Sequence, residues 1–313
     1  MDPVASSTRL SALGAVFLAC LALASPARAE APKPLGTAQT SAAGWSSRAA
    51  EDVRAGKPLV IEVFVPLCSD DKGGPCGKHP GAGEAKNLED NLYWGAVFGA
   101  NRYLGRRDTG WSRVESGPAE SFELERVTFK RSVSGAGWGT SGSVDVFVVL
   151  HAIDGDSGQA ALERFLDVAG RGGSLKLGDG TTQDVHAVGF MGRNPLLVNG
   201  RVPSKLALPA APSGTGIPIF TTMAHARETL GSYVRRAGSR EILLPRGPVA
   251  SEGYVLDAVL QGLAKNETGW SIRKRVVKAY TRWHKSVPAP LAEVYFSPAM
   301  PKAWGIGAQK PLG

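Results

Sequence analysis

The stretch Leu-Val-Ile-Glu-Val-Phe-Val at residues 59–65 decides the fold class of this chain. It is an almost continuous apolar run of strand length, rich in β-branched residues, as expected of a strand that is covered on both faces. Apolar residues at helical spacing follow over 88–104, which predicts a helix there. A strand followed by a helix is the first sign of an α/β protein.

The alternation of strand and helix patterns continues along the chain. Further strands are predicted at 122–133, 144–150, 185–190, 217–221 and 242–244, and further helices at 160–166 (ending at Gly170), 224–236, 252–263 and 271–285. This alternation predicts an α/β fold with a mostly parallel sheet and helices on both faces. The glycine-rich segment 134–142 leads into a strand, so we expect a hairpin or a mobile loop there and no phosphate-binding loop.

The composition bounds the class of protein and its domain organisation. With 313 residues, 43% of them hydrophobic, 20% charged and only 3 Cys, the chain is no disordered tail, coiled coil or disulfide-dense scaffold. Residues 30–50 are rich in Ala, Pro, Gly, Thr and Ser and are interpreted as a flexible leader. Because no linker composition follows, we expect one α/β domain over 51–300 and a C-terminal tail over 301–313.

The first residues have the pattern of a secretory signal peptide. Arg9 supplies positive charge, residues 10–23 are almost wholly apolar, and small residues precede a predicted cleavage after Ala29. The apolar stretch is shorter than the ~20 residues that span a bilayer, and no later window is longer. We therefore expect residues 1–29 to be removed and the protein to be secreted or periplasmic. Lipidation at Cys20 is the weaker alternative, because Phe17 stands where a small aliphatic residue is usual.

Cys68 and Cys76 are the cysteines left after such cleavage. They lie close together in a loop that contains Gly and Pro, so a disulfide is expected in an oxidising compartment. A metal site that includes His79 is the alternative, but it lacks a fourth ligand. No His or Glu pair has helical metal-ligand spacing elsewhere, so we expect neither a metal nor a cofactor.

The formal net charge of +8 is concentrated near the C-terminus. The segment 271–285 carries no acidic residue and holds Arg273, Lys274, Arg275, Lys278, Arg282 and Lys285. A basic amphipathic helix of this kind either leaves its charge solvated or contacts an anionic surface. Arg273, Lys274 and Lys278 are therefore candidate binding residues, and the near-neutral remainder argues against a nucleic-acid-binding protein throughout.

Candidate catalytic residues are few. In open α/β sheets ligands bind beyond the carboxyl ends of the strands, here after residues 65, 153, 190 and 222. Ser157 follows one of these ends, but Gln159 stands where the hydrolase nucleophile motif needs Gly, so a turn and helix cap also explain it. A hydrolase with Ser157 or Thr222 as nucleophile and His186 or His225 as base stays an alternative, with His186 expected near the carboxyl edge.

The block Asn-Leu-Tyr-Trp-Gly-Ala at residues 91–96 resembles a family of uncharacterised bacterial secreted proteins that carry it after a first strand. The resemblance extends over 57–296, with further agreement at 152–155 and 253–258. It implies that Asn91, Tyr93 and Trp94 are candidate binding residues, although Asn91 could simply bond the preceding loop and Trp94 could belong to the core.

That family carries a Val-Gly-His-Asn-Gly-like stretch at one strand end and an Ala-Cys-Lys-Ser-like stretch at the next, a layout that looks like the caspase-like cysteine peptidase fold. Here Phe190 stands in place of the His, and no Cys lies near Thr222. Because such catalysis needs a thiolate and a base, the resemblance implies a caspase-like scaffold without its catalytic pair. We therefore expect a non-catalytic binding or scaffold protein, with the hydrolase and the anionic-surface binder as alternatives.

Overall fold

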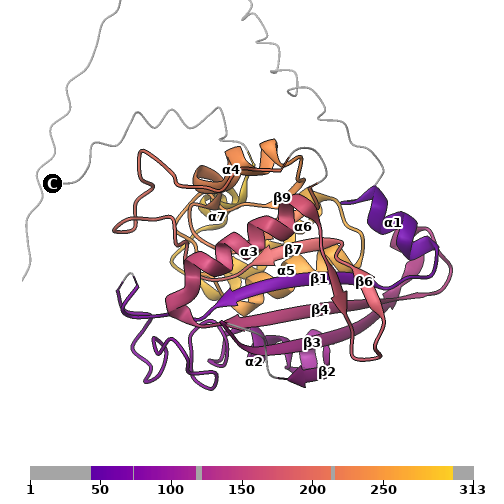
Figure 1. Cartoon of the computed structure of the whole chain (residues 1–313), viewed down its shortest axis with the longest axis horizontal. Helices are drawn as coiled ribbons and strands as arrows, with labels where there is room; N and C mark the ends of the chain where they lie inside the picture. The colour runs from indigo at the N-terminus through magenta and orange to yellow at the C-terminus, as the bar shows by residue number, and fades with distance from the viewer. Residues whose placement is uncertain (1–43, 73, 118–121, 213–215, 299–313) are drawn as a thin grey trace, which may run out of the picture. The chain divides into compact units, whose positions relative to one another are not determined.

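The computed structural model of the chain describes residues 44–72, 74–117, 122–212 and 216–298 (Figure 1). The expected signal peptide 1–29, most of the leader and the tail 301–313 lie outside these residues. The leader boundary at residue 50 falls inside helix α1 (Ser47–Arg54). Trp45 explains the earlier start, because it is buried and its Nε1–H donates to the carbonyl of Leu263 at 2.9 Å.

The main sheet has seven strands in the order β2-β3-β4-β1-β7-β8-β9. Five neighbouring strands are parallel: β4 (Ser143–Ile153), β1 (Leu59–Pro66), β7 (Ala187–Phe190), β8 (Ile219–Thr221) and β9 (Glu241–Leu243). Two antiparallel pairings extend the sheet beyond β4, to β3 (Glu123–Ser134) and then β2 (Ser112–Gly117). The expected mostly parallel α/β sheet is confirmed, and 134–142 connects β3 to β4 as a hairpin.

Helices cover both faces of this sheet. One face packs against α3 (Gly158–Arg171) and α4 (Ala226–Arg236), and the other against α5 (Gly253–Ala264) and α6 (Gly269–Trp283). In Figure 1, α3 crosses in front of the sheet and α5 lies behind it. The remaining elements are α2 (Ala100–Leu104), α7 (Ala289–Phe296), the short helices η1 (Arg107–Thr109), η2 (Gly135–Trp138) and η3 (Gly155–Ser157), and the hairpin β5 (Ser174–Lys176) with β6 (Thr182–Asp184).

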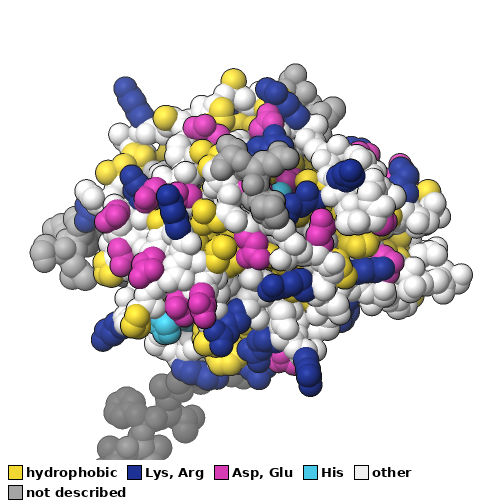
Figure 2. All heavy atoms as spheres, turned by 60° about the horizontal axis from the view of Figure 1, so that its bottom comes forward, with side chains coloured by type: hydrophobic (Ala, Val, Ile, Leu, Met, Phe, Trp, Pro, Cys, Tyr) yellow, Lys and Arg dark blue, Asp and Glu magenta, His cyan; other side chains and the backbone are white. Residues whose placement is uncertain are grey.

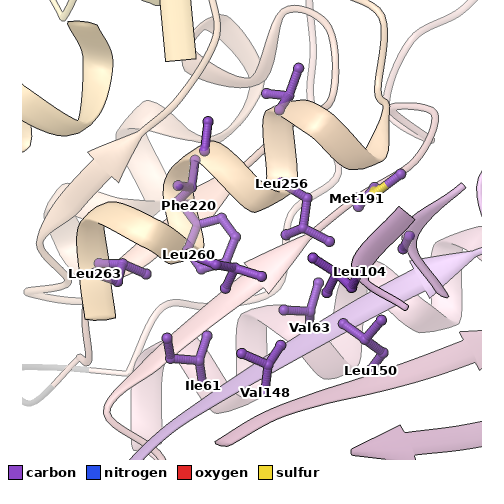
Figure 3. Close-up of a cluster of buried hydrophobic side chains, with 14 of the residues drawn as sticks. Ile61, Val63, Leu104, Val148, Leu150, Met191, Phe220, Leu256, Leu260 and Leu263 are labelled. Atoms are coloured by element: carbon purple, nitrogen blue, oxygen red, sulfur yellow. The ribbon is translucent and has the colours of Figure 1, made fainter. Parts of the chain in front are cut away.

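The alternation of side chains along β1 divides the core in two. Ile61 and Val63 face α5 and pack with Leu256 and Leu260 (Figure 3), whereas Phe64 faces α3 and α4. Since all these side chains are buried, both faces of β1 are covered, as its continuous apolar run predicts.

The helix predicted over 88–104 is wrong except for its last turn, α2. Turns occupy 85–99 because the Asn91 side chain takes backbone partners that a helix would use. A Cβ on Gly95 would stand 2.0 Å from the carbonyl oxygen of Glu89, and one on Gly99 would stand 2.3 Å from that of Trp94. Apolar residues at helical spacing here mark burial of a folded loop.

Candidate functional site

The loop after β1 lies at the carboxyl edge of the sheet. The two strands that pair with β1 lie on opposite sides of it, with β4 on one side and β7 on the other, so the strand order reverses here. Cys68 and Cys76 form the expected disulfide in this loop, with their Cα atoms 6.0 Å apart. Within the described residues, no group of three His, Cys, Asp or Glu side chains is arranged to hold a metal ion. The disulfide is thus a covalent cross-link within the loop after β1.

Asn91, Tyr93 and Trp94 are buried beneath this loop. Asn91 Oδ1 accepts from the backbone N–H of Cys68 at 2.9 Å and of Tyr93 at 3.1 Å, while its Nδ2 donates to the carbonyls of Cys68 and Glu84. Trp94 Nε1–H donates to the Glu125 carboxylate at 2.9 Å. Asn91 therefore holds the loop in place, and Trp94 belongs to the core. Burial raises the pKa of the Tyr93 hydroxyl.

Thr222 lies between β8 and α4 with its hydroxyl turned into the protein. Its Oγ1 is 2.6 Å from the Oγ of Ser251, which accepts from the backbone N–H of Gly192 at 2.8 Å. Both hydroxyls are buried, so Ser251 joins the loop after β7 to the loop after β8. The sequence gives no signal for Ser251, because it comes from a distant segment just before α5.

Arg193 fixes the loop after β7 to the disulfide loop. Its guanidinium donates to the carbonyl oxygens of Ser69 and Lys72, both at 2.9 Å, and of Gly74 at 2.5 Å. Nearby, Asn194 Nδ2 donates to the carbonyl of Ala224 at 2.8 Å. The loops at the carboxyl ends of β1, β7 and β8 are therefore held together by hydrogen bonds to protein groups.

Ser157 occupies the N-cap position of α3 and is half-buried, but its side chain makes no capping hydrogen bond. Asp154 instead accepts from the backbone N–H of Asp156 at 3.0 Å. An open depression of about 560 Å³ lies beside this turn, lined by Glu84, Ala85, Lys86, Asn87 and Asp156. Its lining contains no imidazole, so Ser157 has no base there.

His186 lies at the opposite end of the sheet from the expected one. It precedes β7, and its Nδ1 accepts from the backbone N–H of Val60 at 3.0 Å, near the start of β1. Its Nε2 lies 3.3 Å from the Asp52 carboxylate, and burial lowers the pKa of the imidazole despite this partner. Since both ring nitrogens are occupied, this histidine is unsuited to act as a general base.

His225 is the N-cap residue of α4 and has a left-handed backbone, φ 54°. Within the described residues, no Ser or Thr hydroxyl is hydrogen-bonded to an imidazole. The hydroxyl–imidazole contact that the structure does contain joins Tyr254 to His284 at 2.5 Å. The four candidate catalytic residues are thus not brought together as a nucleophile and base.

The basic segment 271–285 forms most of α6, and its charges differ in environment. Arg273 lies 3.7 Å from Glu241, and Arg275 pairs with Glu267. Lys274, Lys278 and Arg282 are exposed and have no ion pair among the residues that the structure describes. On the face in Figure 2, Lys and Arg are interspersed with Asp and Glu over most of the surface, and several Lys and Arg side chains gather toward its lower edge.

A buried charge cluster on the sheet was not anticipated from the sequence. His151 on β4 has Nε2 3.1 Å from the Glu62 carboxylate and Nδ1 3.1 Å from that of Glu123. Burial alone would lower the pKa of His151, but the two carboxylates outweigh it and raise that pKa. Glu62 was the available signal, because a lone acid in a buried apolar strand needs a buried partner.

No family model, curated protein or solved structure matches the chain. Of the helices in the described part of the chain, none has the length and apolar character needed to cross a bilayer.

Proposed function

We propose that this chain is a secreted or periplasmic, non-catalytic binding protein on a caspase-like sheet. The observation that carries the proposal is the Ser251 bridge between the loops after β7 and β8. There Gly192 and Thr222 are hydrogen-bonded to a serine, whereas a cysteine peptidase needs a free thiolate and an imidazole. The disulfide supports the same proposal, because it occupies both described cysteines.

Further support comes from the positions that would carry the catalytic pair. Phe190, which stands in place of the histidine, is buried and contacts Phe165 edge-on with ring centroids 5.7 Å apart. Thr222, near the expected cysteine position, is fully buried. Neither side chain is accessible to a peptide carbonyl, so binding without turnover fits this edge better than hydrolysis does.

A turnover assay tests the non-catalytic role. We expect no cleavage of peptide or ester libraries by the wild type or by Cys68→Ser/Cys76→Ser, because no imidazole is hydrogen-bonded to a Ser or Thr hydroxyl in the described part of the chain. Product formation is measured by mass spectrometry, with an added active peptidase as positive control. Cleavage that persists in the double variant and is lost in Ser157→Ala or Thr222→Val would overturn the proposal in favour of a hydrolase.

The outer face of α6 favours a second role, docking on an anionic phospholipid membrane. Trp270 is 62% exposed, and the Lys274 ammonium lies 3.5 Å from its ring centroid. An exposed tryptophan beside unpaired cations suits the headgroup region of a bilayer, where its ring is partly buried and lysines meet lipid phosphates.

Vesicle sedimentation tests this membrane role. We expect binding to vesicles that contain phosphatidylglycerol, none to pure phosphatidylcholine, and weakening as salt rises. Trp270→Ser/Lys274→Gln should weaken binding about tenfold, while Arg54→Gln on α1 serves as a charge-matched control. Equal binding by both variants, or binding to DNA but not to vesicles, would contradict it.

A further inference from the structure

A groove lies between α5 and α6. It has a volume of about 310 Å³, near the lower limit of typical small-molecule sites. Ala258 of α5 and Ala279 of α6 line it, one from each helix. Because these side chains are small, the two helices leave space between their larger residues.

The α6 side of this groove is cationic. Arg275, Lys278 and Arg282 line it from successive turns of the helix. Arg275 is paired with Glu267, but Lys278 and Arg282 have no acidic partner among the described residues. Two cations that line one groove and have no ion-pair partner among the described residues attract an anion small enough to enter it.

Asp257 is the acidic residue in the lining, and it forms no ion pair with Lys278 or Arg282 among the described residues. Its Oδ1 accepts from the Trp111 Nε1–H at 2.9 Å and from Gln261 Nε2 at 3.2 Å. Burial raises the pKa of this carboxyl, while the hydrogen bonds from Trp111 and Gln261 and the nearby charge of Arg275 act against that rise. Asp257 and Gln261 therefore present a polar surface in which one carboxyl oxygen is already engaged by two donors.

Aromatic rings close one end of the groove. Trp283 is 41% exposed and its ring contacts Phe98, 4.8 Å away between ring centroids, and Tyr254, 6.1 Å away. The Arg282 guanidinium lies 5.5 Å from the centroid of the same ring. Tyr103 lies beside Tyr254 at 6.3 Å, and the Tyr254 hydroxyl is engaged by Glu252 and His284. These contacts hold the rings in place, so the exposed part of Trp283 offers a fixed apolar surface for a flat ring.

We propose that this groove binds a small anionic ligand that contains a ring, with the ring against Trp283 and Tyr103 and the anionic group between Lys278 and Arg282. Acidic sugars and nucleotides share this chemistry, since both join a ring with a stackable face to a carboxylate or phosphate. This ligand class deepens the binding role proposed above and rests on it. Turnover and ligand binding are measured in separate experiments, so failure of one proposal can be told from failure of the other.

Calorimetric titration of the full chain tests the groove with defined probes: glucuronate, adenosine monophosphate, and the controls glucose, adenosine and inorganic phosphate. We expect one of the two anionic ring compounds to bind at least tenfold more tightly than its neutral counterpart and than phosphate alone. The anionic ring compound that binds identifies the source of the ring. Arg282→Gln should weaken that binding about tenfold, because one charge-assisted contact is lost.

Matched variants separate a binding effect from a folding effect. Trp283→Leu should weaken binding without a matching loss in the thermal midpoint of unfolding, and Arg54→Gln on α1, an exposed cation outside the groove lining, should leave binding unchanged. If no anionic ring compound binds, if phosphate binds equally well, or if Arg54→Gln weakens binding as much as Arg282→Gln, the groove proposal is overturned. The non-catalytic role is untouched by these outcomes, because it fails only if turnover is observed.

Discussion

His151→Leu should lower the free energy of unfolding by about 3–5 kcal/mol at neutral pH, the range expected when one partner of a buried ion pair is removed. The side chains of His151 and Glu62 are 6% and 4% exposed, so water cannot replace the lost imidazolium beside Glu62. Glu123, on the other side of the ring, is 19% exposed and is less affected. Urea unfolding followed by circular dichroism gives the change.

The cost of His151→Leu should also depend on pH. Because the pKa of His151 is raised in the folded state, its stabilising contribution is fully present below its unfolded pKa. That contribution is lost as pH rises through the raised folded pKa. The difference in unfolding free energy between wild type and variant should therefore shrink on going to alkaline pH, as His151 becomes neutral in the wild type.

A compensating change distinguishes lost charge pairing from lost packing. Glu62→Leu/His151→Leu removes both buried charges and should be more stable than His151→Leu alone. His79→Leu, in the exposed part of the disulfide loop, should change the free energy of unfolding by less than about 0.5 kcal/mol. A cost below about 1 kcal/mol for His151→Leu, with no recovery in the double variant, would show that the cluster is not an ion pair.

Asn91→Ala should destabilise the protein by about 3–4 kcal/mol. The side chain is fully buried and makes four hydrogen bonds to backbone groups, so its removal leaves donors and acceptors without partners where water is absent. The loop that carries Cys68 loses its main attachment to the segment after it. Urea unfolding and hydrogen exchange of the Cys68 amide measure the global and the local effect.

Asn87→Ala is the matched control for this loop. Asn87 also accepts from two backbone N–H groups, of Glu89 and Asp90, but it is half-buried, so water replaces part of what is lost. We expect a cost of about 1 kcal/mol or less. If Asn91→Ala and Asn87→Ala cost the same, burial does not set the importance of Asn91, and its proposed loop-holding role is wrong.

The candidate site shows where sequence patterns stop being informative. The sequence identified Thr222, Ser157, His186 and His225 as polar residues near predicted strand ends, and all but His186 lie at the carboxyl edge or just beyond it. His186 is the exception because a residue just before a short strand and one just after it look alike in the sequence, although they lie at opposite ends of the strand. His186 stands before β7, and pairing with β1 places it beside Val60.

Residues 59–65 alone determined that this protein has a buried central strand, because burial on both faces leaves a local, continuous apolar signal. The disulfide could also be predicted, since two nearby cysteines in one loop have few other partners. Only the tertiary structure decided which residues pair with Glu62, that Ser251 joins the loops after β7 and β8 by hydrogen bonds, and that α6 forms a groove with α5. Those features join residues far apart in the chain, and local periodicity records how deeply a side chain is buried but not which side chain it meets.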